Sequence, residues 1–105
     1  MAPSVKLSIE KDPNKEGHYR VIVEGFGLHE AEARQAVIRI RGSDKWYDDN
    51  LFTMNVVEVN GSGFSWEESV PGNLLNEDWG EDDVYALVKI GDLEIKSNTV
   101  EGDFG

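Results

Sequence analysis

The feature that most constrains this chain is the recurrence of apolar side chains at every second position. Val5, Leu7 and Ile9 alternate with polar residues near the start, and the pattern returns in six later segments. Successive side chains of a β-strand point to opposite faces, so a period of two predicts strands with one buried face. The seven predicted strands lie near residues 5–10, 18–24, 36–41, 52–59, 64–70, 84–90 and 93–100.

The spacing of these segments predicts an all-β fold, a seven-stranded antiparallel sandwich of two sheets. Residues 28–34 alone have helix propensity, and so short a segment does not form a stable isolated helix. Parallel folds with crossover helices are therefore excluded. In the fourth predicted strand, Phe52, Met54 and Val56 alternate, but Val57 and Val59 occupy the next apolar positions. A slip of one residue of this kind predicts a β-bulge.

The 105 residues fit a single domain, 1–105, whose tail at 101–105 we expect to be loose. Cysteine is absent, which excludes disulfides, thiolate metal sites and cysteine nucleophiles. Neither a signal peptide nor a membrane-spanning segment is predicted, because alternating residues follow the start directly and apolar runs are short. The prediction is a cytoplasmic protein, with a fragment of a secreted chain as the open alternative.

Acidic residues are concentrated in the second half of the chain. The formal net charge is −11, and residues 46–105 carry two lysines against fourteen Asp and Glu. Such a surface repels phosphate backbones and anionic lipids, so neither nucleic acid nor a membrane is an expected partner. Among partners, the net charge leaves a basic protein or a cation open, and the alternative that we favour is that the charge serves solubility.

Two short segments carry a family resemblance. Residues 81–88 (EDDVYALV) place acidic residues before Tyr85, and residues 23–27 (VEGFG) hold a Gly-Phe pair beside the second predicted strand. In these residues and in strand count, the chain resembles the immunoglobulin-like β-sandwich superfamily, in its disulfide-free, transcription-factor-like subgroup. The cysteine pair of antibody domains is missing, and Leu87 stands in one of its places. The resemblance implies a binding or spacer role rather than catalysis.

The sixth predicted strand fits two registers. The resemblance turns Tyr85 toward the core, which would bury Leu87 and Lys89 beside it. Burying an unpaired lysine is costly or forces it to lose its charge. The alternation offers an inner set without a charged side chain, namely Val84, Ala86, Val88 and Ile90. We therefore favour the second register.

In that register an apolar centre with a charged rim forms on the outside, provided that the third strand neighbours the sixth. This arrangement is typical of protein interaction sites. The predicted interaction patch consists of Val37, Arg39, Arg41, Tyr85, Leu87 and Lys89. In the alternative, a loop containing Leu74, Leu75 and Trp79 folds over this face and buries it. The patch predicts a protein partner or a homodimer.

Two further binding modes would use the acidic segments. Calcium takes carboxylate and amide oxygens as ligands. The candidate ligands are Asp48, Asp49, Asn50, Glu77, Asp78, Glu81, Asp82 and Asp83. Trp46 and Trp79 lie within the same acidic segments, where their rings could stack on a sugar. The alternative to calcium binding is solvated acidic loops without a ligand, and the alternative for the two tryptophans is a role as core or loop anchors.

The sequence offers no catalytic constellation. There are two histidines, His18 and His29, but no Gly-x-Ser-x-Gly motif and no glycine-rich phosphate loop before a helix. We therefore predict no enzyme and no cofactor, calcium excepted. The predicted function is a non-catalytic binding or protein-interaction module. The alternative function is a calcium- or carbohydrate-binding sandwich.

Overall fold

Strands make up most of the structure, a computed structural model that describes residues 3–28, 35–43, 48–59, 63–72, 75 and 82–102. For residues 43, 48–52, 54–58 and 82 it describes the backbone alone. The strands are β1 (Ser4–Lys11), β2 (His18–Phe26), β3 (Gln35–Ser43), β4 (Asp48–Glu58), β5 (Phe64–Pro71), β6 (Asp82–Ile90), β7 (Leu93–Lys96) and β8 (Val100–Gly102). Within the described residues, no helix is long and apolar enough to cross a membrane.

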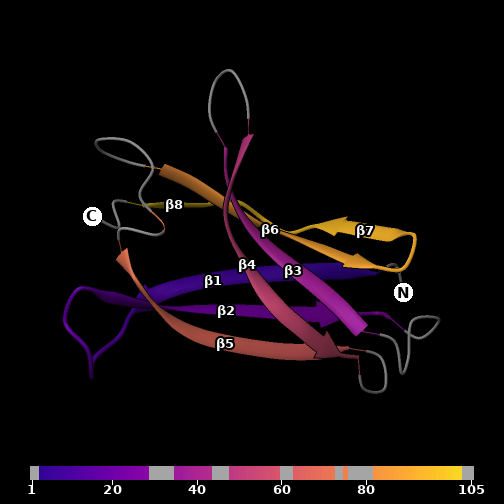
Figure 1. Cartoon of the computed structure of the whole chain (residues 1–105), viewed down its shortest axis with the longest axis horizontal. Helices are drawn as coiled ribbons and strands as arrows, with labels where there is room; N and C mark the ends of the chain where they lie inside the picture. Colours follow the sequence, from indigo (N-terminus) through magenta and orange to yellow (C-terminus); the bar gives the residue numbers. More distant parts are fainter. Residues whose placement is uncertain are drawn as a thin grey trace.

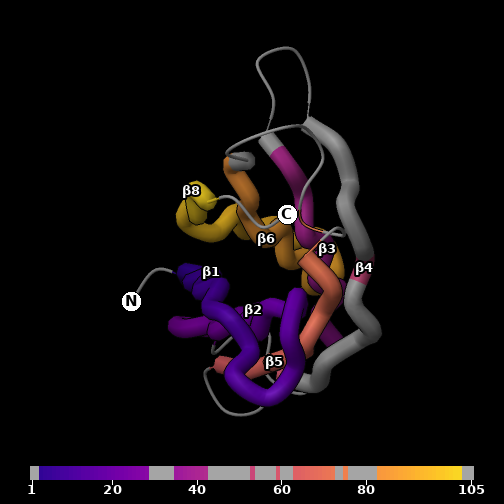
Figure 2. Tube along the Cα trace, turned by 90° about the vertical axis from the view of Figure 1, so that its left-hand side faces the viewer, coloured from indigo at the N-terminus to yellow at the C-terminus, as the bar shows by residue number. Residues whose placement is uncertain are grey.

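The strands form two antiparallel sheets (Figure 1). The three-stranded sheet has the order β1-β2-β5, and the five-stranded sheet has the order β4-β3-β6-β7, with β8 also paired to β6. Figure 2 shows the sheets as two packed layers, with β1, β2 and β5 in one layer and β3, β4, β6 and β8 in the other. The predicted seven-stranded antiparallel sandwich is confirmed, with its seventh strand divided into β7 and β8.

The core lies between the two sheets and follows the predicted alternation. In the three-stranded sheet, Val21 and Val23 are completely buried. The five-stranded sheet contributes seven residues that are at most 2% exposed, namely Ala36, Ile38, Ile40, Val84, Ala86, Val88 and Ile90. Lys89 is exposed. The register of β6 that keeps the lysine outside the core is therefore confirmed.

A β-bulge in β4 keeps the alternation in phase with β3. Ala36 pairs with Val57 and Ile38 with Met54, so one additional residue of β4 lies between these two pairs. This is the place where the apolar pattern slips by one position, as the sequence predicts. A second irregularity follows between Ile40 and Arg41. The first bulge leaves both Met54 and Val57 at register positions opposite buried residues.

The break between β7 and β8 joins the two sheets. The Ser97 hydroxyl accepts a hydrogen bond from the Ala86 backbone N–H at 2.8 Å, which fixes the break against β6. The next side chain, Asn98, accepts a bond from the Leu7 N–H at 2.8 Å and donates one to the Leu7 carbonyl at 3.1 Å. Because β1 is an edge strand, these bonds satisfy backbone groups that the three-stranded sheet leaves unpaired.

Two predictions about the end of the chain are wrong. The seventh strand does not continue unbroken to Val100, because Ser97 and Asn98 make the contacts described above. The tail is not loose from residue 101, because Glu101 pairs with Asp83 and Gly102 with Asp82 in β8. Residues 103–105 lie outside the described part of the chain.

Two backbones approach closely at the end of β2. A Cβ atom built on Gly63 would lie 2.1 Å from the carbonyl oxygen of Gly25. A Cβ atom built on Gly25 would lie 2.4 Å from the ring of Phe64, which belongs to the core. Both distances are far below van der Waals contact, so both positions require glycine. The Gly-Phe pair at positions 25 and 26 therefore has a packing reason in this structure.

We expect Gly63→Ala to lower the free energy of unfolding by about 1–3 kcal/mol, because the new methyl group overpacks against backbone that cannot move aside. Gly17→Ala is the control, since Gly17 has a φ of 77° but nothing within 4 Å of its Cβ position. That variant should lose only about 1 kcal/mol, from backbone strain. Urea denaturation of both variants measures the difference, and a Gly63→Ala variant as stable as wild type would contradict the close approach.

Candidate functional site

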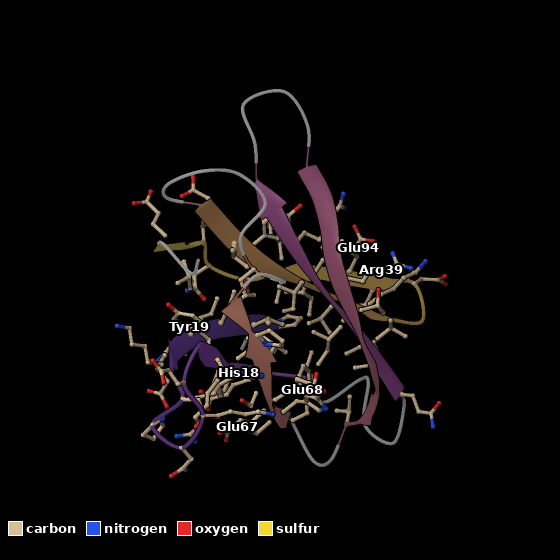
Figure 3. All side chains as sticks on the ribbon, turned by 60° about the vertical axis from the view of Figure 1, so that its left-hand side comes forward. His18, Tyr19, Arg39, Glu67, Glu68 and Glu94 are labelled. Atoms are coloured by element: carbon tan, nitrogen blue, oxygen red, sulfur yellow. The ribbon has the colours of Figure 1, made fainter. Side chains whose placement is uncertain are left out.

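The predicted interaction patch lies together on the outer face of the five-stranded sheet. In the β3–β6 ladder, Val37 pairs with Lys89, Arg39 with Leu87 and Arg41 with Tyr85. The intervening residues of both strands form the core, so these six residues share the opposite face. In Figure 3, Arg39 and Glu94 lie on a different side of the molecule from His18, Tyr19 and Glu67 of the three-stranded sheet.

Leu87 lies at the centre of a row that crosses the sheet. Arg39 is its partner in β3, and Lys96 is its partner in β7. Neighbouring strands are about 5 Å apart, so the two cations flank Leu87 at close range. Leu87 and Val37 are half-buried, whereas Arg39 and Lys96 are exposed. The six predicted residues and Lys96 are called the outer patch below.

Tyr85 is the member of the outer patch that is buried. Its side chain is not part of the core cluster, yet it is only 3% exposed. The ammonium nitrogen of Lys96 lies 4.3 Å from the centroid of the Tyr85 ring, a cation–π contact. The prediction that Tyr85 points away from the core is correct, but Lys96 covers the ring. Leu87 and Val37 therefore supply the apolar surface that a partner could reach.

Of the loop that is the alternative cover for this face, the structure describes Leu75. Leu75 is completely buried and belongs to the core cluster between the sheets. Its backbone N–H donates a hydrogen bond to the Gly72 carbonyl at 3.0 Å. Leu74 and Trp79 lie outside the described residues. Within the described residues, Leu75 is therefore not the cover of the outer patch.

The acidic segments meet at one end of the five-stranded sheet. Ser43 pairs with Asp48 of β4 on one side and with Asp83 of β6 on the other, and Asp83 also pairs with Glu101. Backbone pairing thus brings candidate ligands from two segments alongside one strand end. The described residues hold no group of three or more His, Cys, Asp or Glu side chains that could bind a metal ion.

Several calcium and sugar candidates cannot be placed. Glu77, Asp78 and Glu81 lie outside the described residues, as do Trp46 and Trp79. Asp49 pairs with Gly42, Asn50 with Arg41 and Asp82 with Gly102, but these pairings concern the backbone alone. The calcium and carbohydrate hypotheses therefore stay predictions.

The outer face of the three-stranded sheet carries a different kind of polar cluster. Arg20 forms ion pairs with Glu67 and, at 3.2 Å, with Glu10. A hydrogen bond from the Ser69 hydroxyl, 2.6 Å from an Asp12 oxygen, is the main cause that lowers the pKa of the Asp12 carboxyl. A backbone N–H bond from residue 14 adds to this effect. Asp12, Arg20, Glu67 and Ser69 line an open depression together with Asn14 and Glu68, so that one cation lies among three carboxylates.

Sequence reasoning missed three parts of these surfaces. Lys96 was not assigned to the outer patch, although its alternation with Ile95 in the strand after Gly91 could have indicated its face. The bonds between Asn98 and Leu7 join residues 91 positions apart, and no local pattern predicts such a pair. The hydrogen bond between Ser69 and Asp12 joins residues 57 positions apart, and no local pattern predicts it either.

Comparisons with protein-family models, with curated proteins and with solved structures find no match for this chain.

We expect Ser69→Ala to return the pKa of Asp12 toward its ordinary value of about 3.9. Because folding lowers this pKa, the carboxylate stabilises the fold above the unfolded pKa and loses that effect as the pH falls through the folded pKa. The variant should therefore be less stable than wild type at neutral pH, and the two should converge in acid. Urea denaturation across this range, with Ser65→Ala as the control, measures the effect. A difference that persists unchanged in acid would contradict it.

Proposed function

We propose that this chain is a non-catalytic protein-interaction module and that it docks its partner on the outer patch. The observation that carries the proposal is the row in which a half-buried Leu87 lies between Arg39 and Lys96. Interaction sites typically combine an apolar centre with a polar, solvent-accessible rim. A second half-buried apolar residue, Val37, lies on the same face.

The contacts of the polar residues also support a non-catalytic role. A hydrolytic triad needs a histidine hydrogen-bonded to the serine nucleophile and an acid behind the histidine. Here the Ser69 hydroxyl bonds directly to Asp12, and the Nδ1 atom of His18 lies 3.3 Å from the Glu16 carbonyl oxygen. In these described residues, the serine hydroxyl bonds directly to the carboxylate, and His18 contacts a backbone carbonyl instead of the serine.

The strand order supports membership of the immunoglobulin-like superfamily as part of the proposal. In that architecture the first, second and fifth strands share one sheet, and the third, sixth and seventh share the other. The sheets β1-β2-β5 and β3-β6-β7 have this division, whereas the fourth strand, β4, pairs with β3 and not with the fifth strand as in constant-type domains. Functions differ widely among such sandwiches, so the proposed function rests on the outer patch and not on the fold.

We expect Leu87→Arg to abolish partner binding while the domain stays folded. Ile22→Arg is the matched control, because Ile22 is a half-buried apolar residue on the outer face of the other sheet. Immobilised wild type and Ile22→Arg should retain the same discrete protein from an extract of the source cells, and Leu87→Arg should not. Mass spectrometry of the retained protein and circular dichroism of each variant are the measurements.

Two outcomes would count against the proposal. If wild type and both variants retain the partner equally, the outer patch is not part of the interface. Unfolding of Leu87→Arg alone would show that Leu87 contributes to the core, and the milder Leu87→Ser would then have to lose the partner while folded. Light scattering of wild type identifies the case in which the partner is a second copy of the chain.

A further inference from the structure

We infer that the outer patch takes an acidic polypeptide segment, one in which carboxylates flank an apolar side chain. This inference rests on the proposed function and adds the chemistry of the partner. It differs from the basic partner that the net charge of −11 leaves open, because the charges next to the docking row have the opposite sign.

The first observation is where the scarce cations lie. Residues 46–105 contain fourteen acidic residues and two lysines, Lys89 and Lys96. Both lysines lie on the outer face of the five-stranded sheet, at register positions beside Arg39, Leu87 and Val37 of the outer patch. By register, the acidic residues of this face in the described part of the chain are Glu94, opposite Lys89, Glu58, opposite Gln35, and Asp48, Asp83 and Glu101 at the end of the sheet. The row through Leu87 contains no acidic residue.

The second observation concerns the ion pairs of these cations. In the described part of the chain, the recorded ion pairs belong to Arg20, on the opposite sheet. Arg39 and Lys89 are exposed and form no ion pair with a described carboxylate. Arg20 is therefore paired within the fold, whereas Arg39, Lys89 and Lys96 are exposed on the other sheet.

A partner that covers Leu87 has to bring negative charge to the cations on either side of it. A partner that packs on Leu87 takes water away from Arg39 and Lys96, which lie about 10 Å apart across three strands. Removing a charge from water is costly unless an opposite charge replaces the solvent. A second copy docked face to face would bring cations against cations. Carboxylates on either side of an apolar side chain satisfy both requirements.

The partner is a short segment and not a long polyanion. Charges separated by more than about 8–10 Å are largely screened at physiological ionic strength. A short segment that covers the row through Leu87 stays about 13 Å along β6 from Asp83, whereas a long polyanion also extends over Asp83 and Glu101 at the end of the sheet. Nucleic acid moreover offers no apolar side chain for Leu87.

The experiment uses fluorescence anisotropy of the whole protein with a short labelled peptide that alternates glutamate with leucine. A matched peptide with glutamine in place of glutamate is the ligand control. We expect wild type to bind the glutamate peptide and not the glutamine peptide. Arg39→Glu should weaken binding at least about tenfold, since it replaces attraction by repulsion at the interface. Lys6→Glu makes the same change in net charge at an exposed position of β1 and should leave binding unchanged.

Three results would overturn the inference. The first is equal weakening by Arg39→Glu and Lys6→Glu, which indicates attraction to net charge alone. The second is equal binding of both peptides, and the third is equal binding of a short single-stranded RNA. If the peptide does not bind while a cellular partner is still lost on Leu87→Arg, the acidic partner is wrong and the docking face stands. Circular dichroism confirms that each variant is folded.

Discussion

The pairing of β3 with β6 is the interaction on which the rest of the structure depends. Ile38 lies opposite Val88 and Ile40 opposite Ala86, so both strands turn one apolar face toward the three-stranded sheet. The same register places Arg39 beside Leu87 on the other face. A shift of one residue would exchange the two faces and bury the cations, which is why the buried side fixes the register so strongly. Core and candidate docking surface are thus two consequences of one alignment.

The two outer faces of the sandwich differ in whether their cations form ion pairs. On the three-stranded sheet, Arg20 forms ion pairs with Glu10 and Glu67, and Ser69 donates a hydrogen bond to Asp12, so carboxylates outnumber the one paired cation in this cluster. On the five-stranded sheet, cations surround half-buried apolar residues instead. Surface ion pairs contribute little to stability, so the difference concerns recognition more than folding. A cation that is already paired, such as Arg20, has little to offer an acidic partner, whereas the exposed Arg39, which forms no ion pair with a described carboxylate, has more.

Much of this arrangement could be predicted from the sequence, because alternation is a local property. The period of two predicts the inner residues of β6, the phase slip at Val56 and Val57 predicts the bulge in β4, and the absence of a lysine from the inner set selects the register. The cation–π contact of Tyr85 could not be predicted, because it joins the ring to Lys96 of a neighbouring strand. Nor could the interruption after Lys96, where Asn98 bonds to an edge strand at the far end of the chain. Contacts that join distant segments leave no periodic signal.

The most direct test of this account is a set of cross-strand backbone NOEs between β3 and β6, measured by NMR on the isotopically labelled protein. The account predicts contacts that align Ile40 with Ala86 and Ile38 with Val88. Contacts that align Ile40 with Tyr85 or Leu87 would contradict it, because Arg39 and Lys89 would then face the core and the outer patch would not exist.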